Sequence, residues 1–262
     1  SGKKIKAYRT AETGKGSGKF QLYDLKDDPA EKNNIAPKHP QLVKKLNELL
    51  TSERVDEAVG FANTYHSWQG PKDTSIAKAS SWSDYIYQNS GVTYMQESGS
   101  PKASWCAKIA QGSALADKDA AFLGLEISGK LTVKSGANVE ARNELRVGDK
   151  GQLILQGGSV ESLRWVDVQE GAVLAGHGVV NAALYSKGTL ALSLGKPLVV
   201  KGPAQLSGKL SLIGQGKVKS SQSITVLKAK LISGRFVNNE VSFAGKSYTI
   251  GYTETSITLT AK

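Results

Sequence analysis

The stretch Glu144-Leu-Arg-Val-Gly-Asp-Lys-Gly-Gln-Leu-Ile-Leu-Gln-Gly-Gly-Ser-Val160 holds two short apolar runs, and glycine closes each of them. In the first run Leu145 and Val147 alternate with a charged residue, which is the period of a β-strand with one buried face. In the second run the order Leu-Ile-Leu leaves open whether Leu153 or Leu155 faces inward. Glycine accepts the backbone conformations of tight corners. The stretch therefore predicts short strands joined by sharp turns.

The same pattern recurs over much of the chain from residue 117 onward. Two or three strand-length pieces occur in roughly every 20 residues, and no helical stretch lies between them to cross over a sheet. This spacing predicts a solenoid whose stacked coils bury inward Leu, Val and Ile side chains in a continuous column. The pieces are Phe122–Gly129, Leu131–Gly136, Leu145–Gly151, Gln152–Gly158, Val166–Gly171, Ala172–Gly176, Gly188–Gly195, Leu198–Gly202 and Gln205–Gly214.

Two of these stretches resemble a known repeat. Glu144–Val160 and Gly171–Val180 are similar to the repeat of autotransporter-type passenger domains and of bacterial surface proteins that carry such repeats. The ending of the chain resembles their terminal strand pair over Val226–Ala229, Ile232–Phe236 and Tyr248–Thr260. The resemblance implies a mainly β fold, a right-handed parallel β-helix over residues 117–262, and it implies little about activity. Leu190–Leu194 departs from the usual Ala-Pro-Gly corner, so the strand register there stays open.

Residues 1–54 follow a different pattern. Gln21, Tyr23 and Leu25 alternate with their neighbours as in a half-buried strand. Asp27-Asp28-Pro29 is a turn sequence, because proline fixes φ and aspartate bonds the backbone ahead of it. Pro40 suits the first turn of a helix, and an apolar face formed by Leu42, Leu46, Leu49 and Leu50 predicts a helix near residues 40–50. This segment is therefore predicted to be a short strand-turn-helix unit in front of the solenoid.

The order of residues in Gln21–Leu50 resembles the closing segment of the arylsulfatase family. The resemblance implies a parent polypeptide that hydrolyses sulfate esters with calcium and a formylglycine, and whose catalytic domain precedes this chain. The nucleophile motif of that family, Cys or Ser-x-Pro-Ser-Arg, is missing here, because none of the seven prolines is followed by serine. We therefore expect no catalytic residue, no metal site and no cofactor in this chain, and the sulfuric ester hydrolase activity in the missing N-terminal part.

Residues 55–116 hold three of the four tryptophans in a segment without regular spacing. Trp82 and Trp105 are candidates for a binding surface, because a flat aromatic ring suits the apolar face of a sugar ring. The alternative is that Trp68, Trp82 and Trp105 plug the end of the following domain, where they bury a large apolar area. The segment is expected to be a Trp-rich linker that leads into the solenoid.

Positive charge is concentrated near the C-terminus. The formal net charge is +11, and residues 184–262 hold 11 Lys/Arg against 2 Asp/Glu. A basic segment favours anionic partners such as a sulfated polysaccharide or an acidic cell-surface polymer. Nucleic acid is the weakest choice, because no basic helix or RNP-type motif accompanies the charge. The candidate binding residues are Lys187, Lys196, Lys201, Lys209, Lys217, Lys219, Lys228, Lys230 and Arg235. The alternative is a solvated face that keeps strand edges from pairing.

Other chemistry is sparse. Cys106 is the only cysteine, so it forms no disulfide within the chain. His39, His66 and His177 lack the spacing of metal ligands and are expected to be exposed turn residues. No apolar run approaches the length of a membrane-spanning helix.

The sequence thus predicts three parts: a remnant of the sulfatase C-terminal subdomain (1–54), the Trp-rich linker (55–116) and a β-helical repeat domain (117–262). We expect a non-catalytic part of a secreted, periplasmic or cell-surface bacterial protein, in which the β-helix attaches the protein to a surface or binds anionic, sulfated polysaccharide. One alternative is a structural adhesin or an autotransporter-like passenger spacer without a ligand. A second is a carbohydrate-active β-helix, which carboxylates aligned on one face would favour.

Overall fold

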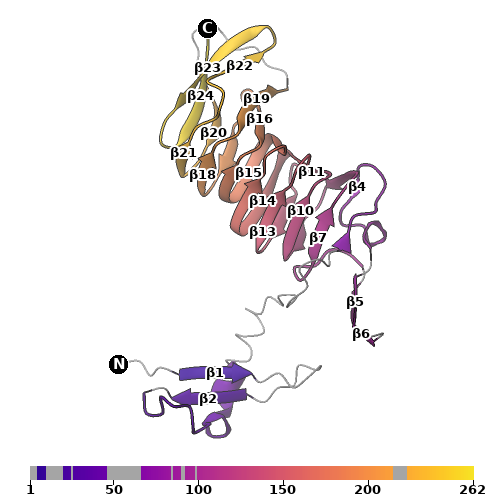
Figure 1. The fold of residues 1–262 in the computed structure, drawn as a ribbon, viewed down its shortest axis with the longest axis vertical. Helices are drawn as coiled ribbons and strands as arrows, with labels where there is room; N and C mark the ends of the chain where they lie inside the picture. The colour runs from indigo at the N-terminus through magenta and orange to yellow at the C-terminus, as the bar shows by residue number, and fades with distance from the viewer. Residues whose placement is uncertain are drawn as a thin grey trace. The chain divides into compact units, whose positions relative to one another are not determined.

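In a computed structural model, the chain divides into two compact units, Ser1–Asp56 and Glu57–Lys262 (Figure 1). The structure describes residues 5–9, 20–24, 26–45, 66–83, 85–89, 92–97, 99–214 and 223–262.

The first unit contains the predicted strand, turn and helix in that order. Strand β1 (Ile5–Arg9) pairs antiparallel with β2 (Phe20–Asp24). A short 3-10 helix, η1 (Ala36–Lys38), follows the turn, and helical backbone occupies residues 40–45. The helix was predicted to extend to residue 50, and the last five of these positions lie outside the described residues.

Two polar side chains hold the turn of this unit. The Asp28 carboxylate accepts hydrogen bonds from the backbone N–H groups of Lys32 at 3.1 Å and Asn33 at 2.7 Å. The side-chain oxygen of Asn34 accepts from the N–H groups of Leu22 and Ala36, each at 3.0 Å. Asn34 therefore ties β2 to the start of η1, because it satisfies backbone donors of both elements.

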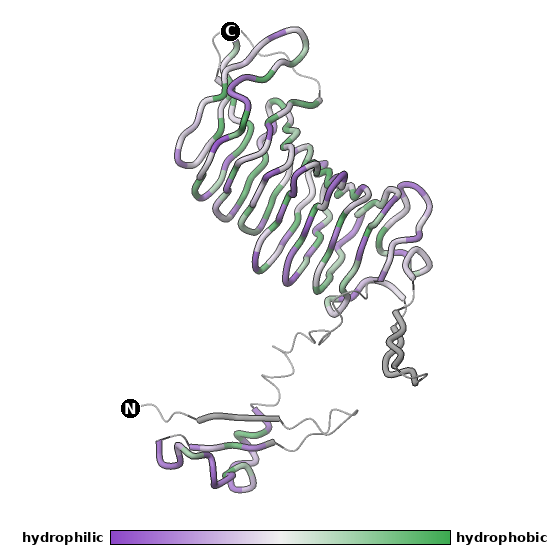
Figure 2. The backbone as a smooth tube through the Cα atoms, in the orientation of Figure 1, coloured by the Kyte–Doolittle hydropathy of each residue, from purple (hydrophilic) through white to green (hydrophobic). Residues whose placement is uncertain are grey.

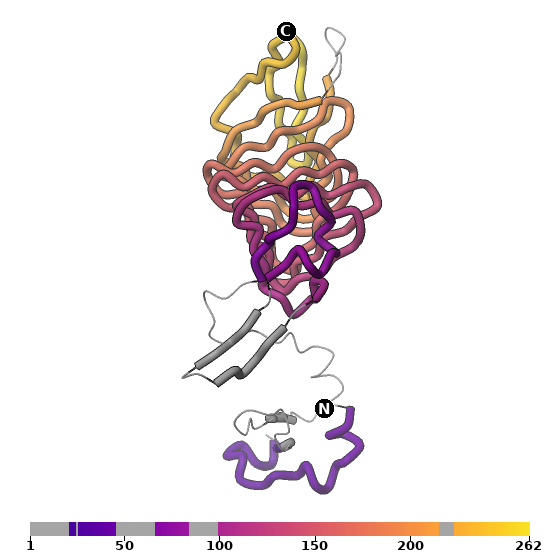
Figure 3. The backbone as a smooth tube through the Cα atoms, turned by 90° about the vertical axis from the view of Figure 1, so that its right-hand side faces the viewer, coloured from indigo at the N-terminus to yellow at the C-terminus, as the bar shows by residue number. Residues whose placement is uncertain are grey.

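The second unit is a mainly β solenoid of about five turns, built from stacked parallel coils, which confirms the predicted fold class (Figures 1 and 3). Each full coil contributes a strand to three parallel sheets, which we call faces A, B and C. Face A contains β3 (His66–Ser67), β7 (Cys106–Ile109), β10 (Gly124–Ile127), β13 (Glu144–Val147), the ends of β14 (Gln152–Val168) and β15 (Val173–Ser186), β18 (Pro203–Leu206) and β21 (Leu231–Gly234).

The other two faces use the remaining strands. Face B contains β4 (Thr74–Ser75), β8 (Ser113–Ala116), β11 (Lys130–Lys134), the starts of β14 and β15, β16 (Thr189–Ser193) and β19 (Lys209–Ile213). Face C contains β9 (Ala120–Phe122), β12 (Asn138–Ala141), the middles of β14 and β15, β17 (Leu198–Val200) and β20 (Ser223–Lys228).

In-register stacking places like residues above one another in the core. Figure 2 shows apolar and polar positions alternating along the coils of this unit. On face A the inward column is Leu125, Leu145, Val166, Leu184 and Ala204, all buried. On face B it is Leu131, Leu153, Leu174, Leu190 and Leu210, and on face C it is Val139, Val160, Val180 and Val200. The column buries apolar area along the whole stack, which is the main source of stability in such repeats.

Among the described residues, parallel pairing is already present at His66, on the N-terminal side of the residue-117 boundary suggested by the sequence. The short 3-10 helix η2 (Ala79–Ser81) and the antiparallel hairpin of β5 (Tyr85–Asn89) and β6 (Val92–Glu97) are inserted in this part. His66 is buried and its ring stacks on Trp105 with centroids 3.4 Å apart. The prediction that His66 is an exposed turn residue is therefore wrong, because aromatic packing at the end of the core encloses it.

The last coil ends in antiparallel strands. Strand β24 (Ser256–Ala261) pairs with β20 and with β23 (Lys246–Tyr252), and β23 pairs with β22 (Glu240–Phe243). The predicted terminal strand pair is thus present. The register at Leu190, which the sequence left open, is continuous: Leu190 pairs with Leu174 on one side and with Leu210 on the other.

Candidate functional site

Lys187 and Lys209 line one hollow at the corner between faces A and B. Lys187 directly follows β15, and Lys209 is the first residue of β19 one coil later. The hollow has a volume of about 540 Å³, and Gly188 and Gly208 leave its floor without side chains. A Cβ on Gly208 would lie 1.7 Å from the carbonyl oxygen of Gly188, so the close backbone approach of these two coils requires glycine there. The corner therefore presents two ammonium groups and the Glu170 carboxylate around one depression.

The other described members of the predicted basic set lie elsewhere on the solenoid. Lys196 lies in the corner between β16 and β17, and Lys228 is in β20 on face C. Lys201 and Lys230 both lie where face C turns into face A, on neighbouring coils. The guanidinium of Arg235 lies over the ring of Tyr252, 4.9 Å from its centroid. Lys217 and Lys219 lie outside the described residues.

These seven described cations share one property. Each is exposed. Among the residues that the structure describes, none of the seven forms an ion pair with a carboxylate; the ion pairs found there use Lys108, Arg142, Arg146 and Lys262. Exposed ammonium and guanidinium groups without a carboxylate partner are able to bind an approaching anion. The basic residues are distributed over all three corners of the solenoid and do not form a single stripe.

The two predicted aromatic binding residues are in the core. Trp82 is 5% exposed and Trp105 is 1% exposed. Trp82 packs edge-on against both Trp68 and Trp105, and its indole N–H donates to the carbonyl oxygen of Ile76 at 2.8 Å. This burial leaves no ring face for a sugar, so the prediction that Trp82 and Trp105 bind sugar is wrong. The two residues instead close the N-terminal end of the solenoid core, which is the alternative that the sequence offered.

Two aromatic residues that sequence reasoning missed, the partly exposed Trp165 and the exposed Tyr185, lie on the outer surface of face A. The rings of Trp165 and Tyr185 meet at 6.1 Å between centroids and at 89° between planes. Tyr185 is 41% exposed. The guanidinium of Arg164 lies 5.8 Å from the centroid of the Trp165 ring. Because Trp165 and Tyr185 belong to neighbouring coils, only the coil register brings them together, and that register is not readable from the sequence.

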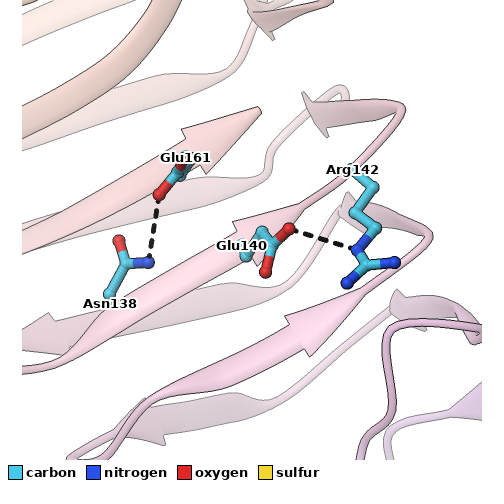
Figure 4. Close-up of polar contacts among 4 residues, drawn as sticks. All are labelled: Asn138, Glu140, Arg142 and Glu161. Atoms are coloured by element: carbon cyan, nitrogen blue, oxygen red, sulfur yellow. Dashed lines mark hydrogen bonds and ion pairs between the residues drawn. The ribbon is translucent and has the colours of Figure 1, made fainter. Parts of the chain in front are cut away.

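A carboxylate pair lies on face C. Glu140 and Glu161 are direct neighbours in the parallel ladder between β12 and β14. Each is tied to another side chain: Glu140 accepts from Arg142 at 3.2 Å, and Glu161 accepts from Asn138 at 3.5 Å (Figure 4). Adjacent carboxylates on one face are the feature that the carbohydrate-active alternative requires.

Two partly buried groups near these surfaces have shifted pKa values. Burial raises the pKa of the Cys106 thiol above its ordinary value, so the reactive thiolate is scarce at neutral pH. Burial lowers the pKa of His177, and the positive charge of Lys196 lowers it further, so the imidazole is neutral at pH 7.

At the surface near the N-terminal end of the solenoid, the Ser113 hydroxyl donates to Asp73 and lowers the pKa of that carboxyl. In the parts that the structure covers, no group of three or more His, Cys, Asp or Glu side chains is arranged to hold a metal ion. No helix in those parts is long and apolar enough to cross a membrane.

Comparison with known proteins gives one short similarity. The chain is 62% identical over 32 residues to the N-acetylgalactosamine-6-O-sulfatase of Bacteroides thetaiotaomicron. The match covers 12% of this chain and 6% of that sulfatase. It supports a sulfatase-family segment in the chain. No family model matches the chain, and no solved structure matches it.

Proposed function

We propose that this chain is a non-catalytic module of a secreted or surface-located sulfatase-like protein, and that its solenoid binds sulfated polysaccharide. The observation that carries the proposal is the set of seven exposed cations without carboxylate partners among the described residues, two of which line one hollow. Sulfate groups repeat along such a polymer, and Lys187 and Lys209 lie one coil apart at one corner, so two weak contacts act together there.

The short similarity suggests which polymer to offer. The related sulfatase is named for N-acetylgalactosamine carrying a 6-O-sulfate. Chondroitin 6-sulfate contains this sugar and is a polyanion, so it serves as the probe, and chemically desulfated chondroitin serves as its control. In this role the module would hold a catalytic domain close to its polymeric substrate, which raises the local concentration of sulfate esters.

The test is a matched pair of double variants in the 262-residue chain. Lys187→Gln with Lys209→Gln removes both cations of the hollow, whereas Lys72→Gln with Lys118→Gln removes two exposed cations from other coils. Both variants change the net charge equally. The hollow variant is expected to bind chondroitin 6-sulfate about threefold to tenfold more weakly, since each exposed contact contributes up to about 1 kcal/mol. Equal affinities of the two double variants, measured by calorimetry at low salt, would count against the hollow as the site.

The chain itself is proposed to lack sulfatase activity, because it has no Pro-Ser-Arg nucleophile sequence. Purified chain should release no more product from a chromogenic aryl sulfate than a heat-killed sample does. Turnover above that background would show that the chain carries its own catalytic groups.

The neighbouring carboxylates Glu140 and Glu161 favour a second candidate, a carbohydrate-active solenoid. The two glutamates are paired on neighbouring parallel strands, so both carboxylates project from the same face, as a pair of catalytic carboxylates requires. Their hydrogen bonds to Arg142 and Asn138 favour a structural role instead. Release of reducing ends from desulfated chondroitin by the wild-type chain, absent in Glu140→Gln and Glu161→Gln variants, is the result that would establish this candidate.

A further inference from the structure

The outer surface of face A carries two parallel rows of side chains. Inward residues such as Leu125 and Leu145 lie between them, so both rows point away from the core. The first row runs through Cys106, Gly124, Glu144, Trp165 and Ala183. The second row runs through Lys108, Glu126, Arg146, Asp167, Tyr185 and Gln205. Charged groups thus occupy the early coils and aromatic rings the later ones.

A gap in the first row creates a hollow. Gly124 has no side chain, and it lies in the row between Cys106 and Glu144. The resulting depression has a volume of about 270 Å³. Groups that donate or accept hydrogen bonds surround it: Glu126, Asn143, Glu144, Arg146 and Arg164. Carboxylate, amide and guanidinium groups around a shallow hollow suit the hydroxyls of a sugar ring, because each hydroxyl both donates and accepts.

The charges at the hollow are not equally engaged. Glu126 pairs with Lys108 at 2.7 Å, and Glu144 pairs with Arg146 at 3.2 Å. The Nε atom of Arg146 is buried and has no hydrogen-bond partner. Arg164 is exposed and forms no ion pair with any residue that the structure describes. A guanidinium in this state is able to bind a carboxylate with two parallel hydrogen bonds.

Arg164 links the hollow to the aromatic rings. It lines the hollow and also lies over the Trp165 ring at 5.8 Å. Trp165 and Tyr185 are nearly perpendicular, so their rings form a right-angled corner that opens to solvent, with Tyr185 the more exposed of the two. Aromatic rings bury 150–250 Å² each when covered, roughly the scale at which one ring contributes appreciably to binding.

We propose that the hollow and the Trp165–Tyr185 corner together bind the sugar rings of a uronic-acid-containing polysaccharide. One pyranose ring packs against Tyr185 with its edge toward Trp165. The carboxylate of a neighbouring uronic acid binds Arg164, and hydroxyls of the next residue enter the hollow beside Gly124. The choice of a polysaccharide rests on the proposed function, but this surface recognises ring faces and carboxylates, whereas the basic corners recognise sulfate.

Two reporters of this surface are already present in the chain. Cys106 is the only cysteine, and it lines the hollow. Of the four tryptophans, Trp68, Trp82 and Trp105 are at most 5% exposed, so acrylamide quenching of fluorescence reports mainly on Trp165. A ligand that occupies the surface should slow alkylation of Cys106 and protect Trp165 from quenching. Both measurements use the 262-residue chain without a fluorescent label.

The probe is fully desulfated chondroitin, an alternating chain of N-acetylgalactosamine and glucuronic acid. Wild-type chain is expected to show slower Cys106 alkylation and weaker quenching as the polymer is added, with weak affinity on the order of 1 mM. Tyr185→Ala is expected to weaken this protection about threefold to tenfold, the usual contribution of one aromatic contact. Arg164→Gln is expected to weaken it to a similar degree. Leu163→Ala is the control, since Leu163 is 76% exposed and adjacent in sequence to Arg164.

The outcomes separate this inference from the proposed function. Protection by desulfated polymer that is lost in Tyr185→Ala and Arg164→Gln, and kept in Leu163→Ala, supports the face A site. Absence of protection in the wild-type chain overturns it. If chondroitin 6-sulfate binds through Lys187 and Lys209 while neither reporter responds to any polymer, the proposed function stands and the face A site does not exist. If the reporters respond to the desulfated polymer but Lys187 and Lys209 make no difference to the binding of chondroitin 6-sulfate, the proposed sulfate site is wrong and the face A site stands.

Discussion

Gly176 and Gly195 both have left-handed backbone, with φ of +98° and +78°, but their surroundings differ. A Cβ on Gly176 would lie 1.9 Å from the carbonyl oxygen of Leu155 in the preceding coil, whereas a Cβ on Gly195 meets nothing within 4 Å. Gly195→Ala is therefore expected to cost about 1–2 kcal/mol from backbone strain alone. Gly176→Ala should cost about 3 kcal/mol or more, because a backbone clash is added.

Denaturant unfolding of these two variants separates strain from clash. Since both substitutions add the same methyl group to a left-handed residue, their difference measures the close approach of adjacent coils. Equal losses of stability would mean that the coils at Gly176 move apart at little cost.

His177 makes the stability of the solenoid depend on pH. Its pKa is lowered in the folded chain by burial and by Lys196, whereas in the unfolded chain it titrates near 6.5. As the pH falls below 6.5, His177 becomes protonated in the unfolded chain but stays neutral in the folded chain. The free energy of unfolding therefore falls with pH until the pH passes the folded pKa. Above about pH 7 His177 is neutral in both states and does not change the free energy of unfolding.

The matching variant is His177→Gln, which keeps a polar side chain that does not titrate. The drop in melting temperature between pH 7.5 and pH 5.5 should be smaller in the variant than in the wild-type chain. The difference isolates His177 from the other two histidines. An identical drop in both proteins would contradict a lowered pKa at this site.

At the level of single elements, strand β14 shows how the two-residue period assigns each side chain to the core or to the surface. Leu153 and Leu155 are both fully buried, and Ile154 between them is partly exposed. Leu153→Asp should lower the free energy of unfolding by about 3–5 kcal/mol, since it buries an unpaired charge and leaves a cavity. Ile154→Asp introduces the same residue at a partly exposed position of the same strand and should cost only about 1 kcal/mol. A similar loss in both variants, measured by urea unfolding, would place Ile154 in the core as well.

The short strands could be predicted from the sequence because glycine corners and apolar positions are local signals. The turn after β2 was also readable: Asp28 and Asn34 act on backbone groups within a few residues of the chain or just across the turn. The expectation that only one of Leu153 and Leu155 faces inward was wrong, because residues two apart in a strand face the same side and both are buried. The burial of His66 escaped prediction because its partner Trp105 is distant in sequence.

At the scale of the whole molecule, coil length decides which surfaces exist. Leu174 pairs with Leu190, and Leu190 pairs with Leu210, so successive coils differ in length. A small error in the predicted length of any coil therefore assigns every later side chain to the wrong corner. For this reason the sequence indicated a basic C-terminal part but not the distribution of its lysines over three corners, and it gave no sign that Trp165 and Tyr185 meet.

The most direct test uses the charge of the molecule. The measurement is the affinity of the 262-residue chain for chondroitin 6-sulfate over a salt series from about 0.05 to 0.5 M. Over this range the Debye length shrinks from more than 10 Å to a few ångström. Residues 184–262 hold 11 Lys/Arg against 2 Asp/Glu, so binding should displace counterions from the polymer. We predict a steep loss of affinity, with a log–log slope of about −2 or steeper, and weaker binding of the desulfated polymer at the lowest salt. Equal affinity for both polymers would contradict the account, because binding would then not depend on sulfate. No binding of either polymer at the lowest salt would also contradict it and would favour a spacer without a ligand.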